Sequence, residues 1–247
     1  MSARSNAKSR VPATIDDDPS MAAKVLSQLI ESGARVQGPA VKAYVERLRG
    51  HSPDATPAEL VTKLEKHYLA AVISSGAAVG SAAAFPGIGT LVAMSAIAGE
   101  TVVFLEATAV FVLAVAEVHG IPAEHRERRR ALVLAVLVGE DSKHAVADLL
   151  GTGRTSGAWL SDGAASLPLP AVSQLNSRLL RFFVKKYALK RGAIAFGKML
   201  PVGIGAVVGG VGNRMMGKKI IKNAQLAFGS PPPRWPSTLH VLPVRQP

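Results

Sequence analysis

Apolar residues recur at helical spacing along most of the chain, and the stretches they form are separated by glycine and proline. This pattern predicts an all-α fold, a helical bundle built from two glycine/proline-hinged helical hairpins. The first hairpin is expected over about residues 57–119 and the second over about residues 171–228. An earlier helical stretch, 19–50, is expected to break at Gly38-Pro39.

The first hairpin has the clearest start signal. Thr56-Pro57-Ala58-Glu59 supplies an N-cap, a first-turn proline and a capping-box glutamate. The pattern predicts a helix from there to Ala84, a turn at 85–89, and a second arm from Thr90 to His119. Gly120-Ile121-Pro122 then ends the helical pattern.

Shorter elements connect this hairpin to the second one. We expect a helix from the charged segment 124–130 through Val138, a short helix over 141–150, and a loop over 151–170. The second hairpin is predicted as a helix over 171–199, a turn over 200–205 and a helix over 206–228.

The segments outside the helical pattern are polar or rich in proline. Residues 1–17 are predicted to be a disordered basic/acidic tail, residues 18–228 a single helical domain, and residues 229–247 a Pro-rich, extended and unpacked tail. Pro233-Arg234-Trp235-Pro236 also fits the common PxxP ligand pattern.

Both hinges are apolar, which is unusual for loops in contact with water. No charged residue other than His67 lies between Lys66 and Glu100, whereas Lys and Arg mark the base of the first hairpin. We therefore expect both hairpin tips to associate with a membrane from its cytoplasmic side, in a re-entrant, peripheral or reversible way and not as two full spans. The predicted inserting residues are Phe85, Pro86, Gly87, Ile88, Gly89, Leu200, Pro201, Gly203, Ile204 and Gly205.

Small residues recur every four positions on the predicted helices, as they do where membrane helices approach closely. Tight packing in a soluble core is the alternative explanation. The predicted helix-packing residues are Gly76, Gly80, Gly209, Asn213 and Gly217. Three acids, Glu100, Glu106 and Glu117, lie in the apolar second arm, and we expect them to pair with Lys or Arg from another helix.

Charge is distributed very unevenly along the chain. All 17 Asp and Glu residues lie at or before Asp162, so the remainder is strongly basic. This asymmetry predicts an anionic partner, either a membrane surface or nucleic acid. The residues expected to bind it are Arg178, Arg181, Lys185, Lys186, Lys190, Arg191, Lys218, Lys219 and Lys222. Phe182, Phe183 and Tyr187 lie among them, which keeps a nucleic-acid partner open.

The second hinge resembles a known family. The run from Leu200 to Asn213, followed by Ala224 and Phe228, is similar to the C-terminal motif of the EcsC protein family, and the first hinge fits the upstream part of that family. The resemblance covers about residues 57–228. It implies a bacterial, membrane-associated protein and brings no catalytic residues.

Motifs for catalysis are weak. The segments 192–199 and 212–219 contain GxxxxGK, but both lack the Ser or Thr that holds Mg²⁺, and neither follows a predicted strand. Glu140, Asp141, His144 and Asp148 could share a helix face and hold a metal ion, but a solvated charged turn explains them better. We expect no enzyme activity, catalytic residue, metal or cofactor. The predicted function is anionic-lipid binding with hairpin insertion or self-association. The alternative is a soluble helical protein that binds nucleic acid or an acidic protein through its basic C-terminal third.

Overall fold

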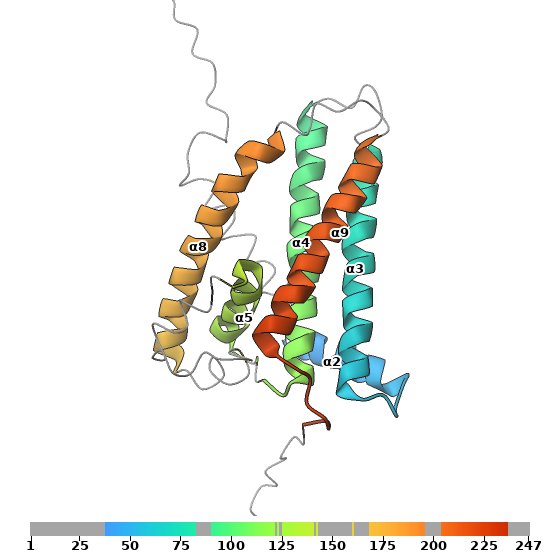
Figure 1. Cartoon of the computed structure of the whole chain (residues 1–247), viewed down its shortest axis with the longest axis vertical. Coiled ribbons are helices and arrows are strands. Elements are labelled where there is room, and N and C mark those ends of the chain that lie inside the picture. The colour runs from blue at the N-terminus through green and yellow to red at the C-terminus, as the bar shows by residue number, and fades with distance from the viewer. Residues whose placement is uncertain are drawn as a thin grey trace, which may run out of the picture.

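The computed structural model describes residues 38–82, 90–121, 123, 125–140, 142, 160, 168–195 and 204–236. Within these ranges, the side chains of 79–82, 90–98, 184–195 and 204–209 are not described. Every regular element of the described residues is an α-helix, which confirms the predicted all-α fold (Figure 1).

Helix α3 (Pro57–Ala82) begins at the predicted capping box. The Thr56 backbone N–H donates to Glu59 Oε2 at 2.8 Å, and the Glu59 backbone N–H donates to Thr56 Oγ1 at 3.3 Å. The two residues thus satisfy each other's backbone donors, as a capping box requires.

Helix α4 (Thr90–Val118) packs against α3. The Tyr68 hydroxyl lies 2.9 Å from Thr108 Oγ1, and its ring stacks on Phe111 at a centroid distance of 4.7 Å. The hinge between the arms, 85–89, lies outside the described residues.

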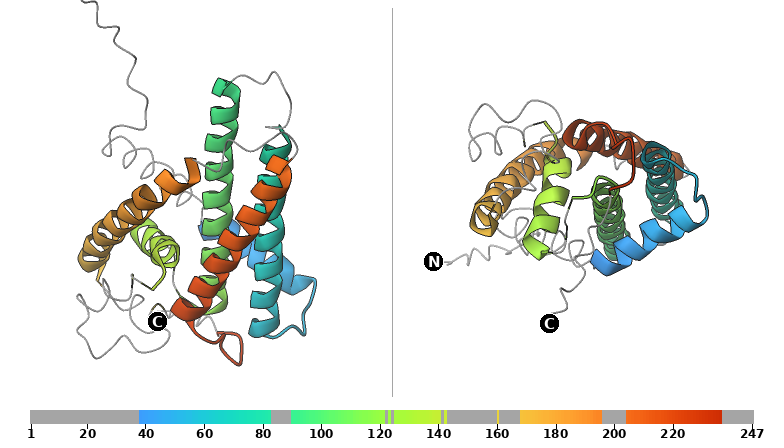
Figure 2. Two further views of the ribbon diagram at one scale, coloured as in Figure 1. Left: turned by 45° about the horizontal axis from the view of Figure 1, so that its top comes forward. Right: turned by 90° about the horizontal axis from the view of Figure 1, so that it is seen from below.

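Helix α4 is also the centre of the fold. Its segment Gly99–Val118 is long and apolar enough to cross a membrane, but 61% of it is buried inside the protein. Helix α2 (Gly38–Gly50) crosses α4 and buries Val41, Val45 and Leu48 on one of its faces. Figure 2 shows α2 and α9 (Ile204–Phe228) on opposite sides of the α3–α4 pair. The apolar length of α4 is therefore explained by its role as a core helix.

The arms of the second predicted hairpin separate. Helix α8 (Leu169–Ala195) lies against α5 (Arg126–Val138), where Asn176 Nδ2 donates to the Glu127 carbonyl at 3.0 Å. Helix α9 instead runs antiparallel to α3 (Figure 1). The helical stretches were located correctly, but the expected pairing of α8 with α9 is not present in the described residues. Periodicity identifies the apolar face of a helix, and it does not identify the helix that covers this face.

The Pro-rich segment after α9 is packed as far as Pro236, which corrects the prediction of an unpacked tail over 229–247. Trp235 packs against the core, its Nε1–H donates to the Ala55 carbonyl at 3.1 Å, and the Arg49 guanidinium lies 4.3 Å from its ring centroid. Composition predicts extension here, but a single large aromatic side chain supplies enough contact area to hold the segment down. Residues 237–247 lie outside the described residues.

Candidate interaction surface

Helix α9 approaches α3 closely because its inner face carries glycine. A Cβ placed on Gly217 would lie 3.0 Å from Leu69 Cδ1 and 3.0 Å from Val72 Cγ2, and one placed on Gly210 would lie 3.8 Å from Ala77 Cβ. Gly76, on α3, is also buried. At Gly210 and Gly217 the small residues pack two helices of one chain together. Gly80 and Gly209 lie where the surroundings are not described.

One polar contact joins the three long helices inside this interface. The Asn213 side-chain amide donates to the Val72 carbonyl of α3 at 2.8 Å and to Glu100 Oε1 of α4 at 2.9 Å. Among the described residues, Glu100 is therefore held by an amide and not by the Lys or Arg that was expected. Glu106 is exposed and Glu117 is half-buried. A neutral partner suffices for Glu100 because its carboxylate is only half-buried and still reaches water.

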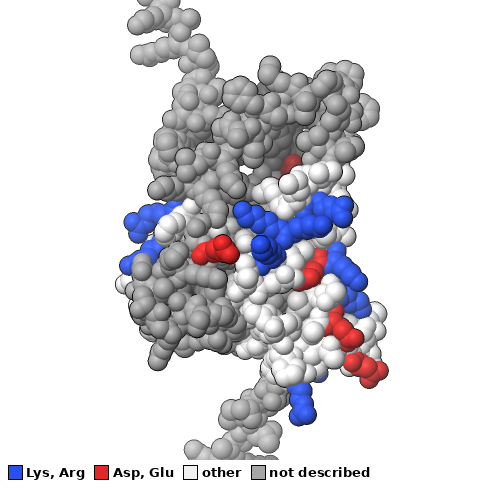
Figure 3. Space-filling view, in the orientation of Figure 1, with Lys and Arg blue, Asp and Glu red and all other residues white. Residues whose placement is uncertain are grey.

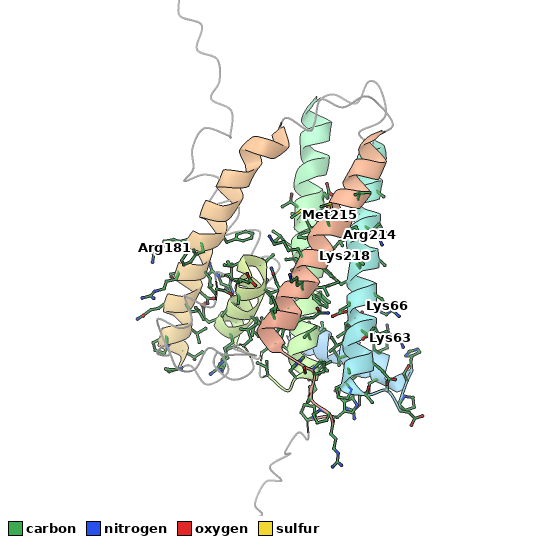
Figure 4. All side chains as sticks on the ribbon, viewed as in Figure 1. Lys63, Lys66, Arg181, Arg214, Met215 and Lys218 are labelled. Carbon is green, nitrogen blue, oxygen red and sulfur yellow. The ribbon has the colours of Figure 1, made fainter. Side chains whose placement is uncertain are left out.

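The outer face of α9 combines exposed apolar and basic side chains. Met215 is 69% exposed and Val211 is 51% exposed, and both lie beside the exposed side chains of Arg214 and Lys218. Figure 4 shows Arg214, Met215 and Lys218 along this face, with Lys66 and Lys63 of α3 beyond them. We call this set, Val211, Arg214, Met215, Lys218 and Lys222, the α9 outer face.

Three cations of the α9 outer face are available to a ligand. Arg214, Lys218 and Lys222 are exposed, and no hydrogen bond or ion pair joins them to any other residue that the structure describes. In the space-filling view, most of the described Lys and Arg residues of this side of the molecule lie across its middle, with some Asp and Glu side chains beside them (Figure 3). A surplus of positive charge attracts an anionic surface.

Helix α8 contributes part of the predicted basic set. Arg181 and Phe182 are exposed and Arg178 is half-buried, while Arg181 also donates to the Ser177 carbonyl at 3.3 Å. The side chains of the remaining α8 residues in that set lie outside the described ones. These residues are Lys185, Lys186, Lys190 and Arg191.

The helix ends that flank both hinges lie at the same end of the molecule. Figure 1 shows the end of α3, the start of α4, the end of α8 and the start of α9 together at the top. Ile204 and Gly205, which were predicted to lie in the second turn, already belong to α9. The other predicted inserting residues, 85–89, Leu200, Pro201 and Gly203, lie outside the described residues.

Several residues of the α9 outer face were missed from the sequence. Lys218, Lys219 and Lys222 were predicted, but Val211, Arg214 and Met215 were not. The available signal was the spacing of 211, 215, 218 and 222, which places these positions on one side of a helix. The prediction used only the positions of Lys and Arg, so it missed the apolar residues Val211 and Met215 between them.

The described residues contain no group of three His, Asp or Glu side chains placed to hold a metal ion. Glu140 is exposed, whereas Asp141, His144 and Asp148 lie outside the described residues. The described residues therefore add no support for a metal site at these four positions.

No family model matches the chain, and neither a curated protein nor a solved structure is significantly similar to it. Membership of the EcsC family stays a prediction from the hinge residues.

Proposed function

We propose that the protein binds the anionic surface of a membrane from its cytoplasmic side and inserts the uncharged end of its helical bundle. The observation that carries this proposal is the α9 outer face, where exposed Val211 and Met215 lie among Arg214, Lys218 and Lys222 without a described partner. Exposed apolar side chains beside exposed cations suit contact with anionic lipid, because the apolar groups can enter the acyl region while the cations meet the headgroups.

The location of the helix ends that flank the hinges supports the same proposal. The hinges connect helix ends that gather at one end of the molecule, so both can approach a bilayer together (Figure 1). Helix α8 also reaches that end, but its last third contains Lys185, Lys186, Lys190 and Arg191, so we assign insertion to α3, α4 and α9 alone and place the end of α8 at the headgroups.

Vesicle flotation tests the proposal. The protein should float with vesicles that contain phosphatidylserine and not with vesicles of phosphatidylcholine alone. The double variant Arg214→Glu/Lys218→Glu should bind the anionic vesicles at least about thirtyfold more weakly, because each basic residue near the surface contributes about 1 kcal/mol. Washing with salt and then with detergent separates electrostatic binding, which salt reverses, from insertion, which needs detergent.

A charge-matched control removes the effect of net charge. Lys42 and Arg47 are exposed on α2, which lies on the opposite side of the α3–α4 pair from α9 (Figure 2). The variant Lys42→Glu/Arg47→Glu has the same formal charge as the α9 variant, and we expect it to bind vesicles almost normally. Equal loss in both variants would contradict a role for the α9 outer face.

Nucleic acid remains the second candidate because Arg181 and Phe182 are exposed side by side on α8. Cations and exposed aromatic rings together can bind single-stranded nucleic acid. Binding to single-stranded DNA or RNA at physiological salt, in the absence of vesicle binding, would overturn the membrane proposal and favour this one.

A further inference from the structure

Among the described residues, α3, α4 and α9 together form an uncharged end of definite height, whereas the neighbouring end of α8 contains Lys190 and Arg191. Helix α4 carries no charge from Thr90 to Gly99, and α9 carries none from Ile204 to Asn213. Each stretch is ten residues long and therefore extends about 15 Å along its helix. Helix α3 is uncharged over the longer stretch Tyr68–Ala82, which packs beside both. The three uncharged stretches meet at one end of the molecule (Figure 1).

This height is about half the thickness of a bilayer's hydrocarbon core. The core measures about 30 Å, so an uncharged end of about 15 Å reaches through one leaflet only. The first charged residues below it are Glu100 on α4 and Arg214 on α9. Arg214 belongs to the α9 outer face, which suits the level of the anionic headgroups.

The uncharged end is also held together as one body. Gly210 and Gly217 let α9 lie directly on α3, and Asn213 joins α9 to both α3 and α4 at the level of Glu100. Separating the helices would leave the Asn213 amide, at the base of the uncharged end, without its two acceptors, which is costly where water is scarce. The three helices therefore enter the leaflet together and occupy area in it.

We infer that the protein binds preferentially to highly curved anionic membranes. A body that occupies area in one leaflet and none in the other expands the first relative to the second. A convex membrane already provides that extra area, so insertion is most favourable there. This inference rests on the proposed membrane binding and adds the shape of the membrane that the protein selects.

Flotation with two vesicle sizes of identical phosphatidylserine content tests the inference on the full chain. At equal lipid area, binding to small sonicated vesicles should be severalfold tighter than binding to large extruded vesicles. The variant Val211→Glu should lose this preference, because it places a charge in the uncharged end. Val211 is 51% exposed, so the variant should fold.

The insertion depth is tested with labelled variants. The chain contains no cysteine, so one introduced cysteine gives a unique site for a fluorescent label. A label at Val211→Cys should be quenched by lipids brominated on their acyl chains. A label at Leu226→Cys, exposed on the same helix below Lys222, should not be quenched.

The possible failures are distinct. No binding to either vesicle size would overturn the proposed function itself. Equal binding to both sizes, with the label at position 211 quenched, would leave membrane binding standing and overturn the curvature preference. Quenching at both labelled positions would contradict insertion limited to one leaflet.

Discussion

The side-chain amide of Asn213 donates a hydrogen bond to the carboxylate of Glu100, at 2.9 Å and across 113 residues of sequence. The same amide nitrogen donates to the Val72 carbonyl. Three helices therefore share one small polar group inside an otherwise apolar interface, and replacing this group should affect all of them.

Asn213→Ala should lower the free energy of unfolding by about 1–3 kcal/mol, because it leaves the half-buried Glu100 carboxylate and the Val72 carbonyl without this donor. Urea denaturation followed by circular dichroism measures the change. Val211→Ala, on the exposed side of the same helix, should change stability by less than about 0.5 kcal/mol. Equal effects of the two variants would contradict the importance of this hydrogen bond.

Two nearby glycines of α9 should respond in opposite directions to a larger side chain. A Cβ on Gly212 would meet nothing within 4 Å, so Gly212→Ala should stabilise the helix by about 0.5–1 kcal/mol. Gly217 contacts Leu69 and Val72, so Gly217→Val should destabilise the protein by about 1–3 kcal/mol. Thermal denaturation of the two variants side by side checks the difference in sign.

Trp235→Ala should destabilise the protein by about 1–3 kcal/mol, because it removes a packed ring and its hydrogen bond to the Ala55 carbonyl. The neighbouring Arg234 is exposed, and Arg234→Ala serves as the control with little expected change. Unfolding midpoints in urea provide the comparison. A Trp235 variant as stable as the control would mean that this segment is held weakly.

The capping box should make stability depend on pH. Hydrogen bonds from the Thr56 backbone and side chain lower the pKa of Glu59 below its ordinary value of 4.5. Because the folded pKa is the lower one, this stabilisation is present above about pH 4.5 and is lost as the pH falls through the folded pKa. Glu59→Ala should therefore lower the unfolding midpoint at neutral pH, and the difference from the unaltered protein should shrink in acid. If the difference in unfolding midpoint between the two proteins stays constant with pH, the ionised Glu59 carboxylate is not the source of the stabilisation.

Local structure was largely predictable from the sequence, and pairing was not. The capping box at Thr56 and Glu59 is a short-range pattern with one geometric solution, and it formed as predicted. The start of α4 at Thr90 and the end of α9 at Phe228 were also predicted, because glycine and proline mark those positions. The partner of α9 depends on the whole fold, and equal arm lengths wrongly favoured α8.

The sequence predicted the basic residues of the candidate surface but not its exposed apolar residues. Runs of Lys and Arg without any acid were visible in the sequence, but the exposed Met215 was not, because methionine occurs more often in cores. Only the packing of Gly217 and Asn213 against α3 determines which side of α9 faces outward. The side that remains carries both the charge and the exposed apolar residues.

The pairing of α9 with α3 has a consequence for synthesis of the protein. Asn213 and Val72 are 141 residues apart, so α3 leaves the ribosome long before α9 has been synthesised. Until Ile204–Phe228 is translated, the side of α3 that carries Leu69 and Val72 has no partner from α9. Contacts between distant parts of a chain form late, and exposed apolar surface invites aggregation in the meantime. Chains that stop before α9 should therefore depend on chaperones or be degraded, because the apolar side of α3 is buried only after α9 has been synthesised and packed against it.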